Sequence, residues 1–493
     1  MIAAHLPVLQ VVIPLVAAPI CVLLRRGRLA WGFTLVVSWV VLGAAILLLG
    51  RTLAEGTISY AIGNWAAPWG IEYRVDAVGA FVTFIVASIG ALVVPFARAS
   101  VRHEIPGDRI SLFYTCYLLC LTGMLGIVVT GDAFNLFVFL EISSLSSYVL
   151  ISLGKDRRAL TAAFQYLVMG TIGATFILIG VGLLYMMTGT LNMADLAQRL
   201  PAVADTRTIR AALAFLTVGV SLKLALFPLH LWLPNAYTHA PSAVSAFLAA
   251  TGTKVAIYVL LRFFFTVFGA AYSLGEMPLA EILMVLALTA SLVASLVAVF
   301  QQDIKRMLAY SSVAQVGYIV LAISFASVTG LTAGIIHLFN HALMKGALFM
   351  AMGCIFLRLG SVHIRDMDGI GKVMPFTMAA FVIGGLSLIG VPLTAGFISK
   401  WYLVQATLEE GLWQIAVLIL VGSLLTVAYI WRVVEVAYFR TPVRPAHEVQ
   451  EAPVSMLVPT WILIAANIYF GVDVSLTFGV AQVAAESLLS FAG

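Results

Sequence analysis

The chain has 493 residues, of which 62% are apolar and only 10% are charged. A soluble domain usually has about 25% charged and about 45–50% apolar residues, so the composition excludes a soluble protein. The formal net charge of +5 is spread over short loops, where it reflects membrane topology and indicates no nucleic-acid partner. The cysteines lie inside apolar stretches without CxxC spacing, so we expect no cysteine-held metal or cofactor. They are Cys21, Cys116, Cys120 and Cys354.

Apolar segments of about 20 residues, enough to cross a bilayer, recur along the chain. The first is followed by Arg25, Arg26 and Arg28, so we expect a retained span and no cleaved signal peptide. The predicted spans are approximately 6–24, 30–50, 76–97, 111–130, 132–153, 161–188, 211–233, 241–267, 280–300, 307–326, 330–357, 376–404, 412–436 and 455–472. A short amphipathic helix is expected around Met193–Leu200, and a last amphipathic or re-entrant piece at 473–490. The predicted fold is an all-α polytopic membrane protein with about fourteen helices.

We expect one membrane domain over residues 1–493. Its expected parts are N-terminal helices 1–3 (1–110), a first five-helix repeat (111–267), a second five-helix repeat (280–436) and a C-terminal helix (455–493). Two spans contain helix breakers, in the strings SLKLALFPLHLWLP and GGLSLIGVPLTAGFISKWY. Backbone groups freed by such breaks are tolerated in a membrane where they line a hydrated cavity or are buried in protein. These are the seventh and twelfth spans, whose odd separation reverses their direction, as in two inverted repeats.

Loop charges predict the orientation of the chain. One set of alternating loops carries seventeen cations and the other six. The larger set is Arg25, Arg26, Arg28, Arg98, Arg102, Arg109, Lys155, Arg157, Arg158, Lys305, Arg306, Arg358, Arg365, Lys372, Arg432, Arg440 and Arg444. The smaller set is Arg51, Arg74, Arg199, Arg207, Arg210 and Arg262. The excess places both termini outside the cytoplasm.

Four lysines remain, and each falls near the middle of a predicted span: Lys223, Lys254, Lys345 and Lys400. Glu141 lies at a similar depth in an earlier span. Ionisable groups in hydrocarbon cost at least about 2.5–3.5 kcal/mol each on insertion scales, and they usually mark an ion or proton path. A row of one carboxylate and four amines therefore indicates charge translocation.

Glu141, Lys223 and Lys254 each have an alternative interpretation that involves no charge translocation. Glu141 could be a neutral core carboxylate held by Ser143 and Ser144. We favour the interpretation that Glu141 pairs with a nearby amine, because such a pair can change between charged and neutral states. Snorkelling is the alternative for Lys223 and Lys254. It is disfavoured because each lies about 12 residues, or about 18 Å of helix, from a span end. A buried lysine can carry protons.

Histidines extend the row. His337, His341 and Lys345 recur every four residues in GIIHLFNHALMKGALF, so they form one polar stripe on a helix face. We interpret the stripe as a hydrated link between Lys254 and Lys400. The alternative that His341 is only a packed, inert side chain stays open. A metal site at the two histidines is disfavoured, because a third ligand is lacking. His230 and His239 flank the cytoplasmic end of the first broken span, where proton entry and helix-end hydrogen bonding are both possible.

Two further groups of charges have simpler interpretations. Asp132 is interpreted as an interfacial or capping residue of the helix that carries Glu141. Asp303, Lys305 and Arg306 stand at the cytoplasmic border, and we interpret them as a topological anchor.

Five strings together carry a family resemblance: GDAFNLFVFLEISSLSSY, SLKLALFPLHLWLPNAYTHAPSAVSAFLAATGTKVAIY, QQDIKRMLAYSSVAQVGY, HALMKGALF and GVPLTAGFISKW. They resemble the antiporter-like subunits shared by Mrp-type cation/proton antiporters, respiratory complex I and membrane-bound hydrogenases. The resemblance covers nearly the whole chain and is strongest to the D-type Mrp subunit.

The resemblance implies roles residue by residue. Glu141, Lys223 and Lys254 match the family's fifth-, seventh- and eighth-helix proton-carrying residues. His337 and Lys345 match the central polar axis, and Lys400 matches the twelfth-helix residue that leads to the outside or to the next subunit.

We therefore expect a proton-conducting subunit of a Na⁺ or K⁺/H⁺ antiporter in a bacterial inner membrane, assembled with A-, B-, C-, E-, F- and G-type subunits. It would be a transporter subunit and no enzyme. The alternative is a proton-pumping subunit of a redox complex, either NADH:quinone oxidoreductase or membrane-bound hydrogenase. A non-conducting scaffold is disfavoured because all five charges are present. The chain has no GxGxxG, cysteine cluster or haem motif, so any redox cofactor would belong to partners.

Overall fold

The computed structural model describes residues 2–441 and 449–490, so Arg444 lies outside the described residues. The helices run α1 (Leu6–Leu23), α2 (Gly27–Glu55), α3 (Ala77–Glu104), α4 (Ile110–Val129), α5 (Ala133–Ser152), α6 (Arg158–Thr188), α7 (Met193–Arg199), α8 (Arg207–Leu224), α9 (Trp232–His239), α10 (Ser242–Leu261), α11 (Leu279–Phe300), α12 (Ile304–Ser324), α13 (Val328–Leu359), α14 (Ile370–Val373), α15 (Pro375–Ile389), α16 (Ala395–Glu409), α17 (Trp413–Phe439), α18 (Val454–Val472) and α19 (Ser475–Ser490). Two π-helical turns follow α10, η5 (Arg262–Val267) and η6 (Ala271–Glu276). Short 3₁₀ turns are η1 (Ile2–His5), η2 (Ile62–Asn64), η3 (Gly107–Arg109), η4 (Leu200–Ala202) and η7 (Ile364–Asp366).

Twelve helices of the described chain are long and apolar enough to cross a membrane. They are α1–α6, α10–α13, α17 and α18. The remaining two crossings are the broken spans, α8 with α9 and α15 with α16. The prediction of an all-α polytopic protein with about fourteen crossings is confirmed, and the predicted short helix and C-terminal piece are present as α7 and α19. The inverted relation between the two five-helix sets stays a prediction.

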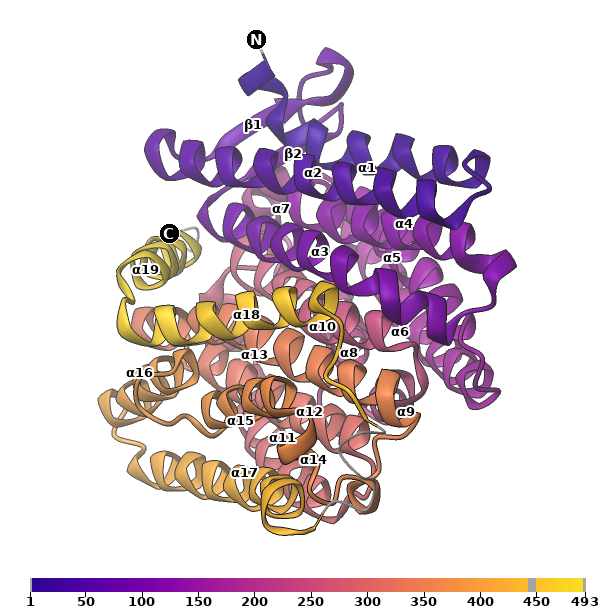
Figure 1. The fold of residues 1–493 in the computed structure, drawn as a ribbon. Coiled ribbons are helices and arrows are strands. Elements are labelled where there is room, and N and C mark those ends of the chain that lie inside the picture. Colours follow the sequence, from indigo (N-terminus) through magenta and orange to yellow (C-terminus); the bar gives the residue numbers. More distant parts are fainter. Residues whose placement is uncertain (1, 442–448, 491–493) are drawn as a thin grey trace.

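The helices lie roughly parallel to one another and are stacked largely in chain order (Figure 1). The N-terminal helices α1–α3 form one end, and α15–α17 form the opposite end. Near the C-terminus, α18 returns to pack against α3 and α13, which joins the two ends of the chain.

Both broken spans end their first half in the same way. After α8, Ala225 adopts a left-handed conformation (φ 58°) and the N–H of Leu226 bonds to the carbonyl of Ser221 at 3.0 Å. After α15, Gly390 is left-handed (φ 92°) and the N–H of Val391 bonds to the carbonyl of Leu386 at 3.0 Å. A left-handed residue at a helix end lets the following N–H satisfy a carbonyl of the last turn. Each break therefore lies in the fourth span of its predicted repeat.

The predicted loop 51–75 contains a small antiparallel hairpin that the sequence patterns did not indicate. Strands β1 (Ile58–Ala61) and β2 (Glu72–Val75) pair with Ile58 opposite Val75. Glu72 fixes the hairpin to the bundle, because its carbonyl accepts from the N–H of Gly131 (2.8 Å) and its carboxylate from the amide of Asn192 (2.9 Å).

A buried ion pair joins the start of α3 to the end of α10. Arg262 donates through Nη1 to Asp76 Oδ2 at 2.6 Å and through Nη2 to Asp76 Oδ1, and its Nε donates to the hydroxyl of Tyr258 at 2.7 Å. Asp76 also accepts from the N–H of Gly79 at the first turn of α3. The prediction that Arg262 is a loop cation is wrong: only 6% of the residue is exposed, because Asp76 balances its charge inside the protein.

Candidate functional site

The five mid-membrane charges lie on helices that follow one another through the stack. Glu141 is on α5, Lys223 on α8, Lys254 on α10, Lys345 on α13 and Lys400 on α16. Figure 1 shows α5 towards one end, α16 towards the other, and α8, α10 and α13 between them. Direct packing of α8 on α10, of α10 on α13 and of α13 on α16 makes this a continuous series.

The series begins with an ion pair. Glu141 Oε1 lies 3.8 Å from Lys223 Nζ, and Lys223 donates to the hydroxyl of Ser144 at 2.8 Å. The side chain of Lys223 is 7% exposed, whereas that of Glu141 is 28% exposed. Glu141 is therefore more exposed than Lys223, because its side of α5 lies at the surface of this chain. Its similar depth in the membrane stays a prediction. Its position leaves the carboxylate reachable both from Lys223 and from outside the subunit.

The helix break beside Lys223 is held by a side chain as well as by the backbone. The carbonyl of Leu222 accepts from the indole N–H of Trp232 at 2.9 Å and from the N–H of Ala225 at 3.3 Å. Predicting this arrangement needs the path of the chain after the break, which local sequence patterns do not give.

A cavity of about 40 Å³ separates Lys223 from the region of Lys254. Its walls include Ser144, Lys223 and Thr253. Such a volume holds at least one water molecule where polar groups are available to bind it. Lys254 itself is fully buried and donates to the carbonyl of Ala249 at 2.6 Å and to the hydroxyl of Thr253 at 3.4 Å.

The predicted polar stripe on α13 is present as one buried face. Lys345 donates to the carbonyl of Leu308 at 2.8 Å and to the hydroxyl of Ser311. His341 stacks on His337, with ring centroids 6.1 Å apart. Both ring nitrogens of His341 are buried without a hydrogen-bond partner among the described residues. Because buried polar groups are normally satisfied by protein or water, this histidine is the point of the stripe where we expect ordered water.

His337 is held on both sides. Its Nδ1 lies 2.7 Å from the hydroxyl of Ser399 and its Nε2 lies 2.9 Å from Gln315 Oε1. The imidazole is thus fixed between Gln315 on α12 and Ser399 on α16, and which of its nitrogens donates depends on the tautomer. In the described part of the chain, no group of three or more histidine, cysteine or acidic residues could hold a metal ion.

Lys400 ends the series at the second helix break. It donates to the carbonyls of Leu388 (3.0 Å) and Ile389 (2.9 Å) and to the hydroxyl of Ser423 (3.0 Å). A Cβ on Gly390 would come within 2.9 Å of Lys400 Cδ, so glycine at this position gives the lysine stem room to pass. The amine therefore replaces the backbone partners that α15 loses where it ends.

Helix α12 supplies partners to three members of the series, a role that the sequence patterns did not predict. Ser311 accepts from Lys345, Gln315 contacts His337, and the ring of Tyr318 lies 5.2 Å from Lys400 Nζ. These residues are spaced by four and three positions, so they share one helix face. That spacing, in the string already singled out for its resemblance, is the signal that could have identified them.

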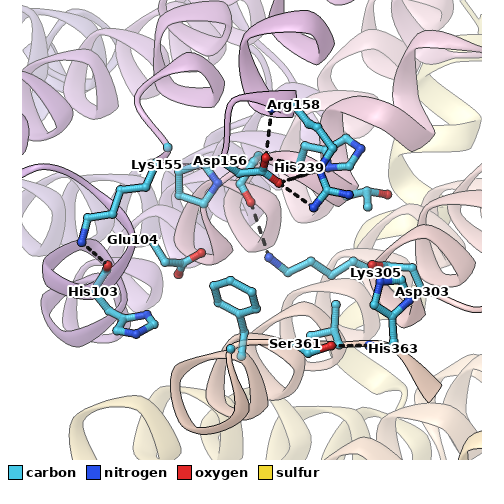
Figure 2. A pocket seen from close by; sticks show the side chains of 17 residues that line it. His103, Glu104, Lys155, Asp156, Arg158, His239, Asp303, Lys305, Ser361 and His363 are labelled. Carbon is cyan, nitrogen blue, oxygen red and sulfur yellow. Dashed lines mark hydrogen bonds and ion pairs between the residues drawn. The ribbon is translucent and has the colours of Figure 1, made fainter. Parts of the chain in front are cut away.

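A polar pocket of about 410 Å³ opens at the membrane face that the loop charges assign to the cytoplasm. In Figure 2, Lys305 from α12 and Glu104 from α3 reach towards each other across it. Both contact Ser242 Oγ, Lys305 at 2.9 Å and Glu104 at 3.1 Å. Lys305 is only 3% exposed, because its ammonium is held inside the pocket, where the Phe356 ring lies 5.1 Å away. Its role as a topological anchor stays a prediction.

The two predicted entry histidines lie in different surroundings. His239 is in the pocket wall, 3.7 Å from a carboxylate oxygen of Asp156. Partial burial opposes the ionisation of Asp156, but hydrogen bonds from Arg158 hold the pKa of this loop carboxyl below its ordinary value, so it stays charged beside His239. His230 is buried elsewhere, with its ring against Phe227 and Tyr310.

The predicted capping residue is confirmed. Asp132 accepts from the N–H of Asn135 at 2.7 Å and so caps the start of α5. The cap lies nine residues before Glu141 on the same helix, and Asp132 takes no part in the series of charges.

Known proteins share both the sequence and the fold. Over 475 residues, 93% of this chain and 94% of the relative, the chain is 43% identical to the N-type subunit of NADH-quinone oxidoreductase from Desulforudis audaxviator. It is 29% identical to the D-type subunit of the Na⁺/H⁺ antiporter from Alkalihalophilus pseudofirmus, over 98% of this chain and 97% of that one. A chain of the membrane-bound sulfane sulfur reductase, an archaeal respiratory membrane complex, superposes with a TM-score of 0.90 at 30% identity and covers 98% of both chains. Residues 130–426 match the transmembrane family of NADH:quinone oxidoreductase and the Mrp antiporter. The chain is thus a multi-pass membrane protein that belongs to the NADH:quinone oxidoreductase/Mrp antiporter family.

Proposed function

We propose that this chain conducts protons as one subunit of a multisubunit membrane complex. The observation that carries the proposal is the series of ionisable side chains from Glu141 to Lys400. An ion pair joins Glu141 to Lys223, and the helices that carry Lys223, Lys254, Lys345 and Lys400 pack on one another in that order. Each lysine of the series has a hydroxyl or carbonyl partner, which is the arrangement a buried amine needs if it is to hold a proton inside a membrane.

The proposed mechanism is stepwise exchange of charge between neighbours. A carboxylate and an amine 3.8 Å apart, such as Glu141 and Lys223, are compatible as an ion pair or as a neutral pair, and each state changes the proton affinity of the next group. Water would carry the proton between side chains at two places: the cavity beside Lys223, and the nitrogens of His341, which have no partner among residues 2–441 and 449–490.

Two host complexes have support. The antiporter resemblance and the 29% identity over nearly full length to a D-type antiporter subunit favour a Na⁺ or K⁺/H⁺ antiporter in a bacterial inner membrane. The loop charges favour both termini outside the cytoplasm. The 43% identity to an N-type subunit of NADH-quinone oxidoreductase favours a redox-driven proton pump. Purification of the intact complex through a tag on this chain, followed by mass spectrometry, separates them. Small antiporter subunits support the first host, and iron–sulfur and flavin subunits support the second.

Replacing Glu141 by glutamine is expected to reduce proton-coupled transport by about a hundredfold or more, because the amide keeps the shape but cannot ionise, and positioned proton-transfer groups contribute on this scale. Glu141→Asp should keep partial activity. Proton movement in everted vesicles is the measurement, and Glu281→Gln, an exposed carboxylate in the first turn of α11, is the matched control. Wild-type transport by the glutamine variant at normal assembly would show that the carboxylate is not required.

The polar pocket of Figure 2 is the proposed cytoplasmic entrance. Lys305 lies on α12 only three and six residues before Leu308 and Ser311, the two partners of Lys345. At about 1.5 Å of rise per residue this is roughly 5–9 Å along the helix. A proton that reaches Lys305 is therefore one or two water-bridged steps from the buried series.

Lys305→Met is expected to slow proton uptake by at least about tenfold, whereas Lys155→Met should not. Lys155 lines the same pocket but is exposed and donates to the backbone carbonyl of His103 at 2.7 Å. Uptake is followed with a pH-sensitive dye in proteoliposomes, and thermal unfolding of each variant controls for loss of structure. Equal uptake by the two methionine variants would exclude an entrance through Lys305.

A further inference from the structure

A second polar pocket, of about 390 Å³, lies where α2 and α4 begin and α3 ends. It is lined by Gly27, Arg28, Trp31, Arg98, Arg102, Ile110 and Tyr114. We call this group the arginine pocket. It shares no lining residue with the pocket of Figure 2, and none of the proposed proton carriers reaches it.

The arginine pocket concentrates positive charge without a balancing carboxylate. Arg28, Arg98 and Arg102 have no ion pair in the described part of the chain, and no acidic residue lines the pocket. The nearest acid along α3, Glu104, is turned away and accepts from Ser100 (2.6 Å) and Ser242 (2.9 Å). All three arginines are exposed, and three guanidinium groups around one hollow attract an anion that can accept paired hydrogen bonds from them.

Specific contacts hold the side chains in one wall of the arginine pocket. The guanidinium of Arg98 lies 4.6 Å from the ring centre of Trp31, and the indole N–H of Trp31 donates to the carbonyl of Val94 at 3.0 Å. Tyr114, only 2% exposed, forms a buried part of the wall. The ring contact orients Arg98, because a guanidinium prefers the face of an indole.

The surroundings indicate what kind of anion fits. The pocket lies at helix ends, on the face that the loop charges assign to the cytoplasm. Exposed apolar side chains continue along the face of α2 that carries Arg28: Val36 is 61% exposed and Trp39 is 47% exposed. An excess of cations on this face follows from topology alone, but topology does not require three arginines to converge on one hollow beside an aromatic ring.

We propose that the arginine pocket binds the phosphate headgroup of an anionic phospholipid, with the acyl chains against the exposed apolar surface of α2. Bidentate arginine–phosphate hydrogen bonds supply the recognition, and basic pockets between membrane helices on the cytoplasmic side are suited to such headgroups. A soluble phosphate could bind the same guanidinium groups. It has no acyl chains, however, to cover the adjoining apolar surface. The proposal does not depend on proton transport.

The test is native mass spectrometry of the delipidated full-length protein, titrated in parallel with phosphatidylglycerol, phosphatidylcholine and inorganic phosphate. We expect one tightly held phosphatidylglycerol, and roughly thirty-fold weaker binding in Arg98→Gln/Arg102→Gln, the loss expected for two headgroup-level cations. Arg157→Gln/Arg365→Gln removes the same charge from the same face away from the pocket and should bind like the wild type. Arg98→Lys/Arg102→Lys should bind with intermediate affinity, because lysine keeps the charge but loses the paired hydrogen bonds.

Three outcomes would overturn the proposal. Equal weakening by the two glutamine pairs would mean that general surface charge holds the lipid. Inorganic phosphate that displaces phosphatidylglycerol and binds as tightly would identify a soluble anion as the ligand. Failure of the assembled complex to bind the lipid, with the arginines protected from an arginine-selective reagent, would identify the pocket as a contact with another subunit.

Discussion

Lys400→Arg is expected to abolish proton transport in a protein that still folds and assembles. Arginine keeps the positive charge and can donate to the carbonyls of Leu388 and Ile389, but it stays protonated at every physiological pH and cannot release a proton. The loss should reach about a hundredfold, as for other positioned proton carriers. Transport in everted vesicles, normalised to the amount of assembled complex, is the measurement.

The structure changes how a neutral replacement at this position must be interpreted. Lys400→Met removes the proton carrier and also the three hydrogen bonds at the break, so its failure alone would not distinguish transport from stability. The arginine variant makes that distinction. Full transport by Lys400→Arg would show that positive charge at the break is sufficient and that the proton does not pass through this side chain.

Arg262→Gln is expected to lower the free energy of unfolding by about 3–5 kcal/mol, because it leaves the carboxylate of Asp76 buried without its partner. The double variant Asp76→Asn/Arg262→Gln should lose less, since no uncompensated charge remains. Unfolding in mixed detergent micelles, followed by circular dichroism, measures both.

Arg51→Gln is the matched control for this prediction. Arg51 also pairs with a carboxylate, Glu55, but on the exposed surface of α2, where ion pairs contribute little. We expect no measurable change. A loss for Arg262→Gln no larger than for Arg51→Gln would show that the buried pair does not stabilise the junction of α3 and α10.

The features predicted correctly from the sequence are those with local signals. Long apolar runs give the fourteen crossings, and Pro228 and Pro392 mark the two breaks close to their observed positions. The four-residue spacing of His337, His341 and Lys345 places them on a single polar face of α13, because helix periodicity alone sets this arrangement.

The features that were missed depend on contacts between distant segments. Arg262 was interpreted as a loop cation because its partner, Asp76, lies 186 residues away. The exposure of Glu141 depends on which side of α5 other helices cover, and the burial of Lys305 depends on α3 and α10 closing over the start of α12. Glu72, in the unpredicted hairpin, is likewise fixed by Asn192, 120 residues further on. None of these pairings leaves a pattern within a single window of sequence.

Helix α12 connects three of the proposed proton carriers to one another. Lys345, His337 and Lys400 each contact a different turn of this one rigid rod, through Ser311, Gln315 and Tyr318. A rotation or axial slide of α12 would therefore alter all three contacts at the same moment. The three contacts are therefore geometrically linked through a single helix.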